Sequence, residues 1–403
     1  MSYSIETISQ LLCAKRIGDK ESRIDWLLTD SRSLCFAEET LFFALQSKRN
    51  DGHKYISDLY ARGVRNFVVS QLPDTASFTD ANFLVVANPL KALQKLAELH
   101  RAKFQIPVIG VTGSNGKTVV KEWLHQLLSP DRVITRSPRS YNSQIGVPLS
   151  VWQLNEESEL AIIEAGISEM GEMRALQSII RPTIGILTNI GGAHQENFFS
   201  LQEKCMEKVS LFKDCDVVIY NGDNDLISDC VAKNMLTARE IAWSKKDKEK
   251  PLFISAINKG TDSTSISYRY LGFDNSFTIP FIDDASIENS LNCLAACLYL
   301  MVPNEEITAR MAKLEPVAMR LEVKEGKNGC VLINDTYNSD IASLDIALDF
   351  LYRRSEAKGM KRTLILSDIL ETGQSTTLLY RKVTQLVHSR GINKIIGVGP
   401  EIT

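Results

Sequence analysis

Two kinds of apolar pattern alternate along most of the chain. In residues 89–104, Leu90, Leu93 and Leu96 recur at the spacing of one helix face, which predicts a helix. Helical stretches then separate short continuous apolar runs at 108–111, 160–164, 184–189 and 217–220. Continuous apolar strands between helices are typical of a buried and mostly parallel sheet. We therefore expect an α/β protein whose middle part holds such a sheet.

These patterns divide the chain into three segments, which we interpret as domains: residues 1–104, 105–313 and 314–403. The first segment mixes helical stretches with short strand-like runs at 40–44, 66–69 and 83–86. The central segment adds a polar, β-rich patch at 253–279 and a helix at 287–301. The third segment predicts a second, Rossmann-like α/β unit from apolar runs at 331–334, 363–366 and 394–398. It ends just past a strand, where another helix would normally cover the sheet, so we expect this unit to be incomplete.

Composition narrows the class of protein. A length of 403 residues exceeds one ordinary hydrophobic core. The net charge of -3 gives no reason to expect nucleic-acid or membrane-surface binding. Neither an apolar run of about 18 residues nor a signal-peptide pattern is present, so we expect no membrane insertion. The eight cysteines include no CxxC pair, and Cys293 and Cys297 read as buried thiols. A reducing cytoplasm fits this usage best.

The clearest candidate for chemistry is the stretch TGSNGKT at 112–118, between a predicted strand and a predicted helix at 119–128. Glycines let backbone N–H groups face phosphate oxygens, and a helix N-terminus adds positive charge. Lys117 would contact the outer phosphates, and Thr118 would place its hydroxyl on Mg²⁺. Val111 departs from the usual pattern, which has Gly there, and an ordinary glycine turn is the alternative. The candidate phosphate-binding residues are Gly113, Ser114, Asn115, Gly116, Lys117 and Thr118.

Two further side chains follow predicted strands. Glu164 ends the run at 160–164, and its carboxylate would face the phosphate loop if the two strands are neighbours. Mg²⁺ favours oxygen ligands, so one or two carboxylates suffice. The alternative is an ordinary glutamate at a strand end. His194 follows the next strand through two glycines; it could be a ligand or a structural histidine.

Together these motifs resemble the Mur ligase family of peptidoglycan synthesis, over essentially the whole chain. The residues that carry the resemblance are TGSNGKT, Glu164, the stretch 189–194 with its histidine, Lys208, and the stretch 221–225. The resemblance implies a three-domain architecture, with a central P-loop domain and a uridine-nucleotide-binding domain before it. It also implies ATP, Mg²⁺ and an acyl-phosphate mechanism.

The resemblance also assigns roles to individual residues. Lys208, 14 residues after His194, matches the lysine that family members carbamylate with CO₂ as a metal ligand. From its pattern alone, Lys204 and Lys208 would be a surface helix pair. Asn289 resembles an adenine contact, as does Asn292, with a capped helix start as the alternative. Arg320 and Asp335 resemble phosphate and ribose contacts that need closure of the third domain.

Motifs outside the ATP site indicate which member of the family is closest. The stretch 334–339, with Tyr337 and Asn338, resembles the motif of ligases that add D-alanyl-D-alanine. Asn142 matches an asparagine near the substrate. Ser31 and Arg32 lie in a stretch similar to the uridine-nucleotide-binding domain.

The implied function is ATP-dependent addition of D-Ala-D-Ala to UDP-MurNAc-tripeptide through an acyl phosphate. Lys117, His194 and Lys208 would be the catalytic residues. Some relatives are fused to alanine racemase, so a fused or associated racemase is a possible partner. Two alternatives stay open: another Mur-type or folylpolyglutamate synthase-like ligase, and a non-enzymatic, nucleotide-gated binding module.

Overall fold

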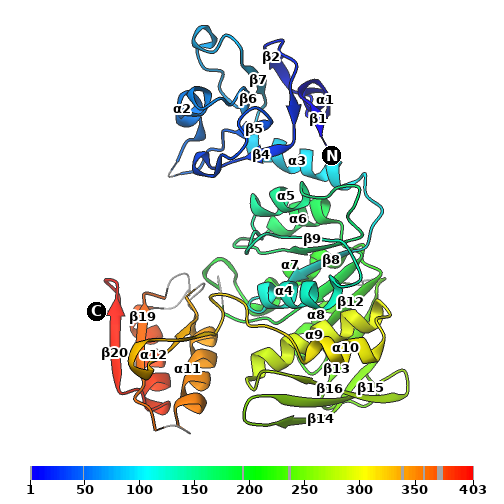
Figure 1. Cartoon of the computed structure of the whole chain (residues 1–403), viewed down its shortest axis with the longest axis vertical. Helices are drawn as coiled ribbons and strands as arrows, with labels where there is room; N and C mark the ends of the chain where they lie inside the picture. The colour runs from blue at the N-terminus through cyan, green and yellow to red at the C-terminus, as the bar shows by residue number, and fades with distance from the viewer. Residues whose placement is uncertain are drawn as a thin grey trace.

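The computed structural model arranges the chain as three α/β units, one for each segment (Figure 1). The central unit lies between the first unit and the third. The structure describes residues 2–48, 50–192, 195–234, 237–336, 340–356, 359–369 and 375–402.

The first unit is built on a five-stranded sheet in which four neighbouring strands are parallel. The strand order is β2 (Lys15–Ile17), β7 (Asn82–Val85), β6 (Asn66–Val69), β5 (Thr40–Phe43) and β4 (Trp26–Leu28). Strand β2 runs antiparallel to β7 at one edge. A small antiparallel pair joins β1 (Tyr3–Ser4) to β3 (Arg23–Ile24). The helices are α1 (Ile5–Leu11), α2 (Ile56–Ala61) and α3 (Pro89–Arg101).

The central unit contains a nine-stranded sheet, parallel along most of its width. The parallel strands, in spatial order, are β9 (Ile134–Arg136), β10 (Leu160–Glu164), β8 (Val108–Thr112), β11 (Ile184–Leu187), β12 (Val217–Asn221), β13 (Arg239–Ser244) and β14 (Leu252–Lys259). Two antiparallel strands extend the far edge, β15 (Thr264–Tyr270) and β16 (Phe273–Ile279). Both the predicted parallel sheet and the β-rich patch at 253–279 are therefore confirmed.

Helices cover both faces of the central sheet because alternate strand residues point to opposite sides. Ile162 packs in one core with Trp123 and Leu291, whereas Ile163 packs in the other with Leu176 and Cys205. The first core lies under α4 (Lys117–Leu128), α9 (Asp284–Tyr299) and α10 (Asn304–Met311). The second lies under α5 (Gly146–Val151), α6 (Glu172–Ile180), α7 (Leu201–Val209) and α8 (Asp225–Lys233).

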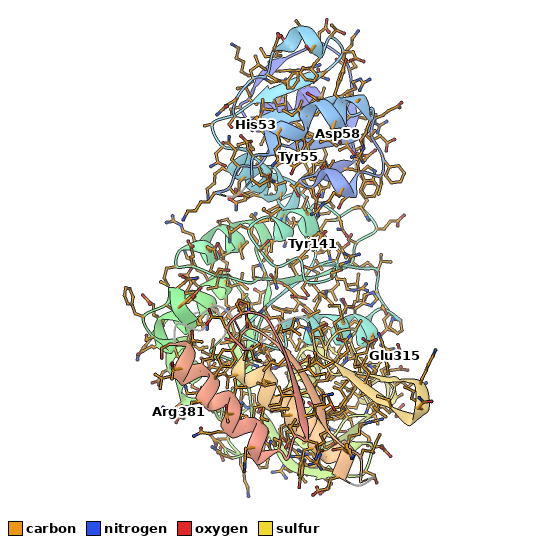
Figure 2. The ribbon with its side chains drawn as sticks, turned by 90° about the vertical axis from the view of Figure 1, so that its left-hand side faces the viewer. His53, Tyr55, Asp58, Tyr141, Glu315 and Arg381 are labelled. Atoms are coloured by element: carbon orange, nitrogen blue, oxygen red, sulfur yellow. The ribbon has the colours of Figure 1, made fainter. Side chains whose placement is uncertain are left out.

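The third unit follows a strand–helix order with two separate pairs of strands. Strands β17 (Glu322–Glu325) and β18 (Val331–Asn334) are antiparallel, and β19 (Thr363–Ser367) and β20 (Lys394–Val398) are parallel. Helices α11 (Ile341–Glu356) and α12 (Thr376–Ser389) share a small core with β19. In the described residues these pairs do not join into one Rossmann-type sheet. In Figure 2 the label Arg381 marks helix α12 of the third unit, and the label Tyr141 marks the central unit.

Several smaller predictions can be checked directly. Cys293 and Cys297 are buried in the central core, as expected. Within the described residues, no helix has both the length and the apolar character needed to cross a bilayer. The domain boundaries at 104 and 313 stay predictions, since helix α3 of the first segment also packs against α5 and α6 of the central unit.

A buried aromatic cluster joins the first and central units. The rings of Tyr3 and His100 each pack on Trp152, whose indole N–H donates to the backbone oxygen of Asp25 at 2.8 Å. His100 Nε2 lies 2.9 Å from the backbone oxygen of Leu154, which can only accept, so Nε2 carries the proton. In the neutral imidazole, Nδ1 accepts from the hydroxyl of Tyr3 at 2.7 Å. Burial of the cluster favours this neutral form.

We predict that this imidazole makes the folded protein sensitive to acid. Burial lowers the pKa of His100 from 6.5 to about 4. Between these pH values His100 is protonated in the unfolded chain but neutral in the folded chain, which stabilises the unfolded chain. The stability from His100 is complete above pH 6.5 and falls as the pH drops towards 4. The loss from this group is about 2 kcal/mol between about pH 7.5 and about pH 5.

Chemical unfolding of the parent and His100→Gln at both pH values measures this contribution as the difference between their pH dependences. Glutamine keeps one donor and one acceptor. An equal pH dependence in the two proteins would contradict the assignment.

Candidate active site

The phosphate loop lies at the carboxyl edge of the central sheet, where β8 ends and α4 begins. Glu164 of β10 pairs with Val111 of β8, and Leu187 of β11 pairs with Thr112. The predicted neighbourhood of Glu164 and the phosphate loop is thus confirmed. Because three adjacent parallel strands end here, their following residues meet at one point.

Two glycines allow the loop to fit closely between its neighbours. Gly113 has φ +144°, and a Cβ there would lie 2.0 Å from Thr188 Oγ1. Gly116 has φ +83° and caps α4; a Cβ there would lie 2.4 Å from Asn289 Oδ1. Both positions therefore need glycine for backbone conformation and for space.

The segment after β11 holds the loop in place. Asn189 accepts the N–H of Ser114 on its backbone oxygen and the N–H of Asn115 on its side-chain oxygen, both at 2.9 Å. The N–H of Gly191 donates to Ser114 Oγ at 2.8 Å. The backbone of Gly191 thus lies directly against the phosphate loop. In this conformation the N–H groups of Ser114 and Asn115 are used internally, which leaves the first N–H groups of α4 to face an anion.

Lys117 folds back over the loop. Its ammonium donates to the backbone oxygens of Gly113 and Ser114, both at 2.9 Å. The pKa of Lys117 is lowered to about 8, chiefly by desolvation and in part by nearby Arg320, while Glu164 and Asp340 oppose the shift. A phosphate group would compete with two carbonyl oxygens for this cation.

The carboxylate of Glu164 is fully buried beside Thr118. Its Oε2 accepts from Thr118 Oγ1 at 3.2 Å and from Asn142 Nδ2 at 3.3 Å. The hydroxyl of Ser140 lies 3.0 Å from that of Thr118. A hydroxyl and a carboxylate oxygen side by side are the oxygen donors that Mg²⁺ prefers.

The described residues do not form a complete metal cage. Among the described residues, no group of three or more His, Cys, Asp or Glu side chains is arranged to hold a metal ion, so phosphate oxygens and water would have to complete a Mg²⁺ shell. His194 lies outside the described residues, and its predicted metal role is untested.

Two lysines of α7 point into the same region. Lys204 and Lys208 are buried, so the interpretation as a surface pair is wrong. Lys208 lines a cavity of about 100 Å³ together with Gly113, Lys117 and Asn142. Burial, with Lys117 and Lys204 nearby, lowers the pKa of Lys208 well below its usual value.

Lys204 is a site residue that the sequence analysis missed. Its ammonium donates to the backbone oxygen of Gly191 at 2.6 Å, and burial lowers its pKa to about 8. Its spacing of four residues from Lys208 was the available signal, because residues i and i+4 share a helix face.

A larger cavity, about 460 Å³, opens on the other side of the phosphate loop. Its wall includes Asn115, Gly116, Asn289, Arg320 and Asp335, so the third unit already contributes to it without further closure. Trp123 and Phe281, stacked with centroids 5.0 Å apart, form part of its apolar lining.

Not every candidate reaches these cavities. Asn292 is buried and accepts from the indole N–H of Trp243 at 2.9 Å, so its reading as an adenine contact is not supported. Ser31 and Arg32 lie on the first unit in the short helix η1 (Ser31–Ser33), and Arg32 is exposed and paired with Asp30. Tyr337 and Asn338 lie outside the described residues.

Comparison with known proteins agrees with this site. Residues 111–297, which include the phosphate loop, Glu164, Lys208 and Asn289, match the Mur ligase middle domain. The chain therefore contains a middle domain of the Mur ligase type.

Individual relatives narrow the likeness within this family. The chain is 28% identical over 386 residues to the UDP-N-acetylmuramoyl-tripeptide–D-alanyl-D-alanine ligase of Bacillus subtilis, covering 94% of this chain and 81% of the relative. A crystal structure of MurF from Acinetobacter baumannii has the same fold, with a TM-score of 0.85, 24% identity, and coverage of 100% and 86%. MurF from Thermotoga maritima, solved in complex with ADP, has a TM-score of 0.78, 20% identity, and coverage of 93% and 85%.

We predict that Gly116→Ala weakens nucleotide binding by about tenfold or more. A left-handed alanine costs about 1–2 kcal/mol, and its Cβ would also displace Asn289 from the cavity wall. Calorimetric titration with Mg-ADP measures the change.

Gly272→Ala is a matched control, since Gly272 has φ +85° in the turn between β15 and β16 and its Cβ would meet nothing within 4 Å. If both variants bind Mg-ADP equally well, Gly116 has no special role in the nucleotide site.

Proposed function

We propose that this chain is the ATP-dependent ligase that adds D-alanyl-D-alanine to UDP-MurNAc-tripeptide in peptidoglycan synthesis. The observation that carries the proposal is the meeting of the phosphate loop, the buried Glu164 and the buried Lys208 between two cavities. The Bacillus subtilis relative named above carries this activity in its name.

The larger cavity suits the nucleoside of ATP. Its apolar wall, with Trp123 and Phe281, suits the face of a base, and we assign Asp335 on the same wall as the acceptor for a ribose hydroxyl. From there the phosphates would reach the N-terminus of α4, Lys117 and Arg320. The relative solved with ADP supports a nucleotide in this family.

Thr118 and the Oε2 atom of Glu164 would hold Mg²⁺ beside the outer phosphates. The bound ion would disperse the negative charge that the phosphates carry during transfer. Lys117 would leave the carbonyl oxygens of the loop and contact the phosphate that is transferred.

The small cavity beside Asn142 and Lys208 suits the carboxylate end of the tripeptide. A carboxylate oxygen would attack the γ-phosphorus of ATP, and the bond to the ADP oxygen would break. The amine of D-Ala-D-Ala would then attack the acyl carbon and lose a proton, and phosphate would leave. The product would be UDP-MurNAc-pentapeptide.

Carbamylation of Lys208 remains part of the proposal. Reaction with CO₂ needs a neutral amine, and burial lowers the pKa of Lys208 in the direction that favours one. A carbamate would turn a cation that repels Mg²⁺ into an anionic oxygen ligand. The role of His194 as a further ligand is proposed from its sequence position alone.

The remaining assignments concern binding and location. We propose that Ser31 and Arg32 contact the uridine nucleotide, and that Tyr337 and Asn338 contact a substrate. We also propose that the reaction takes place in the cytoplasm, where ATP and the two substrates are available. A fused or associated alanine racemase stays a prediction, which none of the matches tests.

Turnover with a panel of amines tests the proposal. We expect ADP release by the full chain to require Mg-ATP, UDP-MurNAc-tripeptide and D-Ala-D-Ala together, because the acyl phosphate forms only on the tripeptide. Coupled detection of ADP measures this rate. A preference for glutamate over D-Ala-D-Ala would favour the folylpolyglutamate synthase-like alternative, and no ADP above background would end the proposal.

A second prediction separates an enzyme from a nucleotide-gated binding module. Lys208→Ala should lower turnover by about 100-fold or more, while the dissociation constant for ATP changes little, because Lys208 acts beside the transferred phosphate. Lys213→Ala is the control, since Lys213 is an exposed lysine just after α7. Full turnover in Lys208→Ala would remove Lys208 from the mechanism.

A further inference from the structure

Lys121 is a fully buried lysine that the proposed reaction does not use. It lies three residues after Thr118 on α4, so both side chains share one helix face. Its ammonium lies 3.3 Å from Glu164 Oε1 and 2.8 Å from Glu122 Oε1. It also donates to the backbone oxygens of Ser137, at 2.8 Å, and Arg139.

Two side chains on one face of α4 thus contact the two oxygens of the Glu164 carboxylate. The hydroxyl of Thr118 donates to Oε2, and the ammonium of Lys121 stands at Oε1. Oε1 accepts no hydrogen bond from the residues that the structure describes, so its contact with Lys121 is ionic. A divalent cation that approached Oε1 would meet this ammonium.

The surroundings prevent Lys121 from moving aside. The loop after β9 accepts from its ammonium, while Ser137 Oγ of the same loop accepts the backbone N–H of Glu164 at 3.1 Å. Glu122, the second acid beside Lys121, is also paired with Arg136 at 3.1 Å. Charges therefore alternate from Arg136 through Glu122 and Lys121 to Glu164, and each buried charge has an opposite neighbour.

We propose that Lys121 is a positioning residue that makes Glu164 a one-oxygen metal ligand and thereby favours Mg²⁺ over Ca²⁺. The inference rests on the proposed function, which puts a metal at Thr118 and Glu164. The ammonium of Lys121 occupies the position beside Oε1 of Glu164, so only Oε2 can contact the metal.

The two cations differ in what they accept from a carboxylate. Mg²⁺ requires near-octahedral geometry with short bonds, whereas Ca²⁺ takes more ligands and readily uses both oxygens of one carboxylate. A carboxylate confined to one oxygen therefore disfavours Ca²⁺ more than Mg²⁺. Loss of the ammonium changes the electrostatic attraction equally for both ions, so the ratio of their affinities reports the geometry alone.

Metal competition without turnover tests the inference. Mn²⁺ bound to the full chain with ADP is followed by its electron paramagnetic resonance signal and displaced by Mg²⁺ or by Ca²⁺. In Lys121→Met, which keeps the length of the side chain, we expect the preference for Mg²⁺ over Ca²⁺ to fall by about tenfold. Lys121→Gln is the second variant, with a polar group for the carbonyl oxygens of the loop, and thermal unfolding confirms that each variant is folded.

Two comparisons show whether the effect acts through Glu164. Glu122→Gln leaves the contact between Lys121 and Glu164 in place, so its preference should stay within about twofold of the parent. In a Glu164→Gln background, Lys121→Met should cause no further change in preference. A general loss of packing would instead add to the effect of Glu164→Gln.

An unchanged ratio in folded Lys121→Met and Lys121→Gln would overturn the inference and leave the proposed function intact. Failure of the parent chain to bind Mn²⁺ with ADP would instead remove the metal site itself, and the inference with it.

Discussion

The register of three parallel strands is the constraint on which the site depends. Strand β8 lies between β10 and β11, and all three end at the same edge of the sheet. Glu164 and Asn189 therefore flank the phosphate loop from opposite sides, one as an acid and the other as an acceptor for loop N–H groups. A shift of either neighbour by one residue would turn Glu164 to the other face of the sheet or would release the loop. Burial of apolar side chains on both faces fixes the register, so the core of the central unit also positions the site.

Three lysine side chains gather at this edge of the sheet. Lys117, Lys204 and Lys208 converge beside the loop, and desolvation lowers the pKa of each. Glu164 opposes this excess, but Lys121 neutralises part of its charge. Burying a cation is costly, because its hydration is lost. The lowered pKa values of the three lysines reflect this cost, and a bound polyanion would add a favourable attraction.

The parts that the sequence predicts best are those in which pattern and geometry are local. The strands at 160–164 and 331–334 were predicted to the residue, because apolar runs and their polar ends mark them directly. Burial of Lys204 and Lys208 could not be predicted from helical spacing, since charged residues on a helix usually face water. The same limit applies to Asn292, which satisfies Trp243 in the core and does not reach the nucleotide cavity. Lys121 escaped notice because its partners come from three separate elements: α4, β10 and the loop after β9.

Helix α4 links the phosphate site to the third unit. Its first turns carry Lys117, Thr118 and Lys121. Its second half binds the linker that follows α10 through two hydrogen bonds to Glu315. The indole N–H of Trp123 donates to the backbone oxygen of Glu315, and the side chain of Gln126 accepts its N–H, both at 2.9 Å. Figure 2 labels Glu315.

A few residues later, Met319 and Leu321 adopt positive φ angles of 60° and 49° on either side of Arg320. Such backbone costs about 1 kcal/mol or more per residue and persists only where the surroundings fix it. The two hydrogen bonds between α4 and Glu315 hold the backbone on one side of Arg320. The hydrogen bond from the N–H of Leu321 to the carboxylate of Asp335 holds it on the other side. Helix α4 therefore carries both the end of the phosphate loop and the contacts to Glu315. The helix that would bind the phosphates thus also helps to hold Arg320 on the wall of the nucleotide cavity.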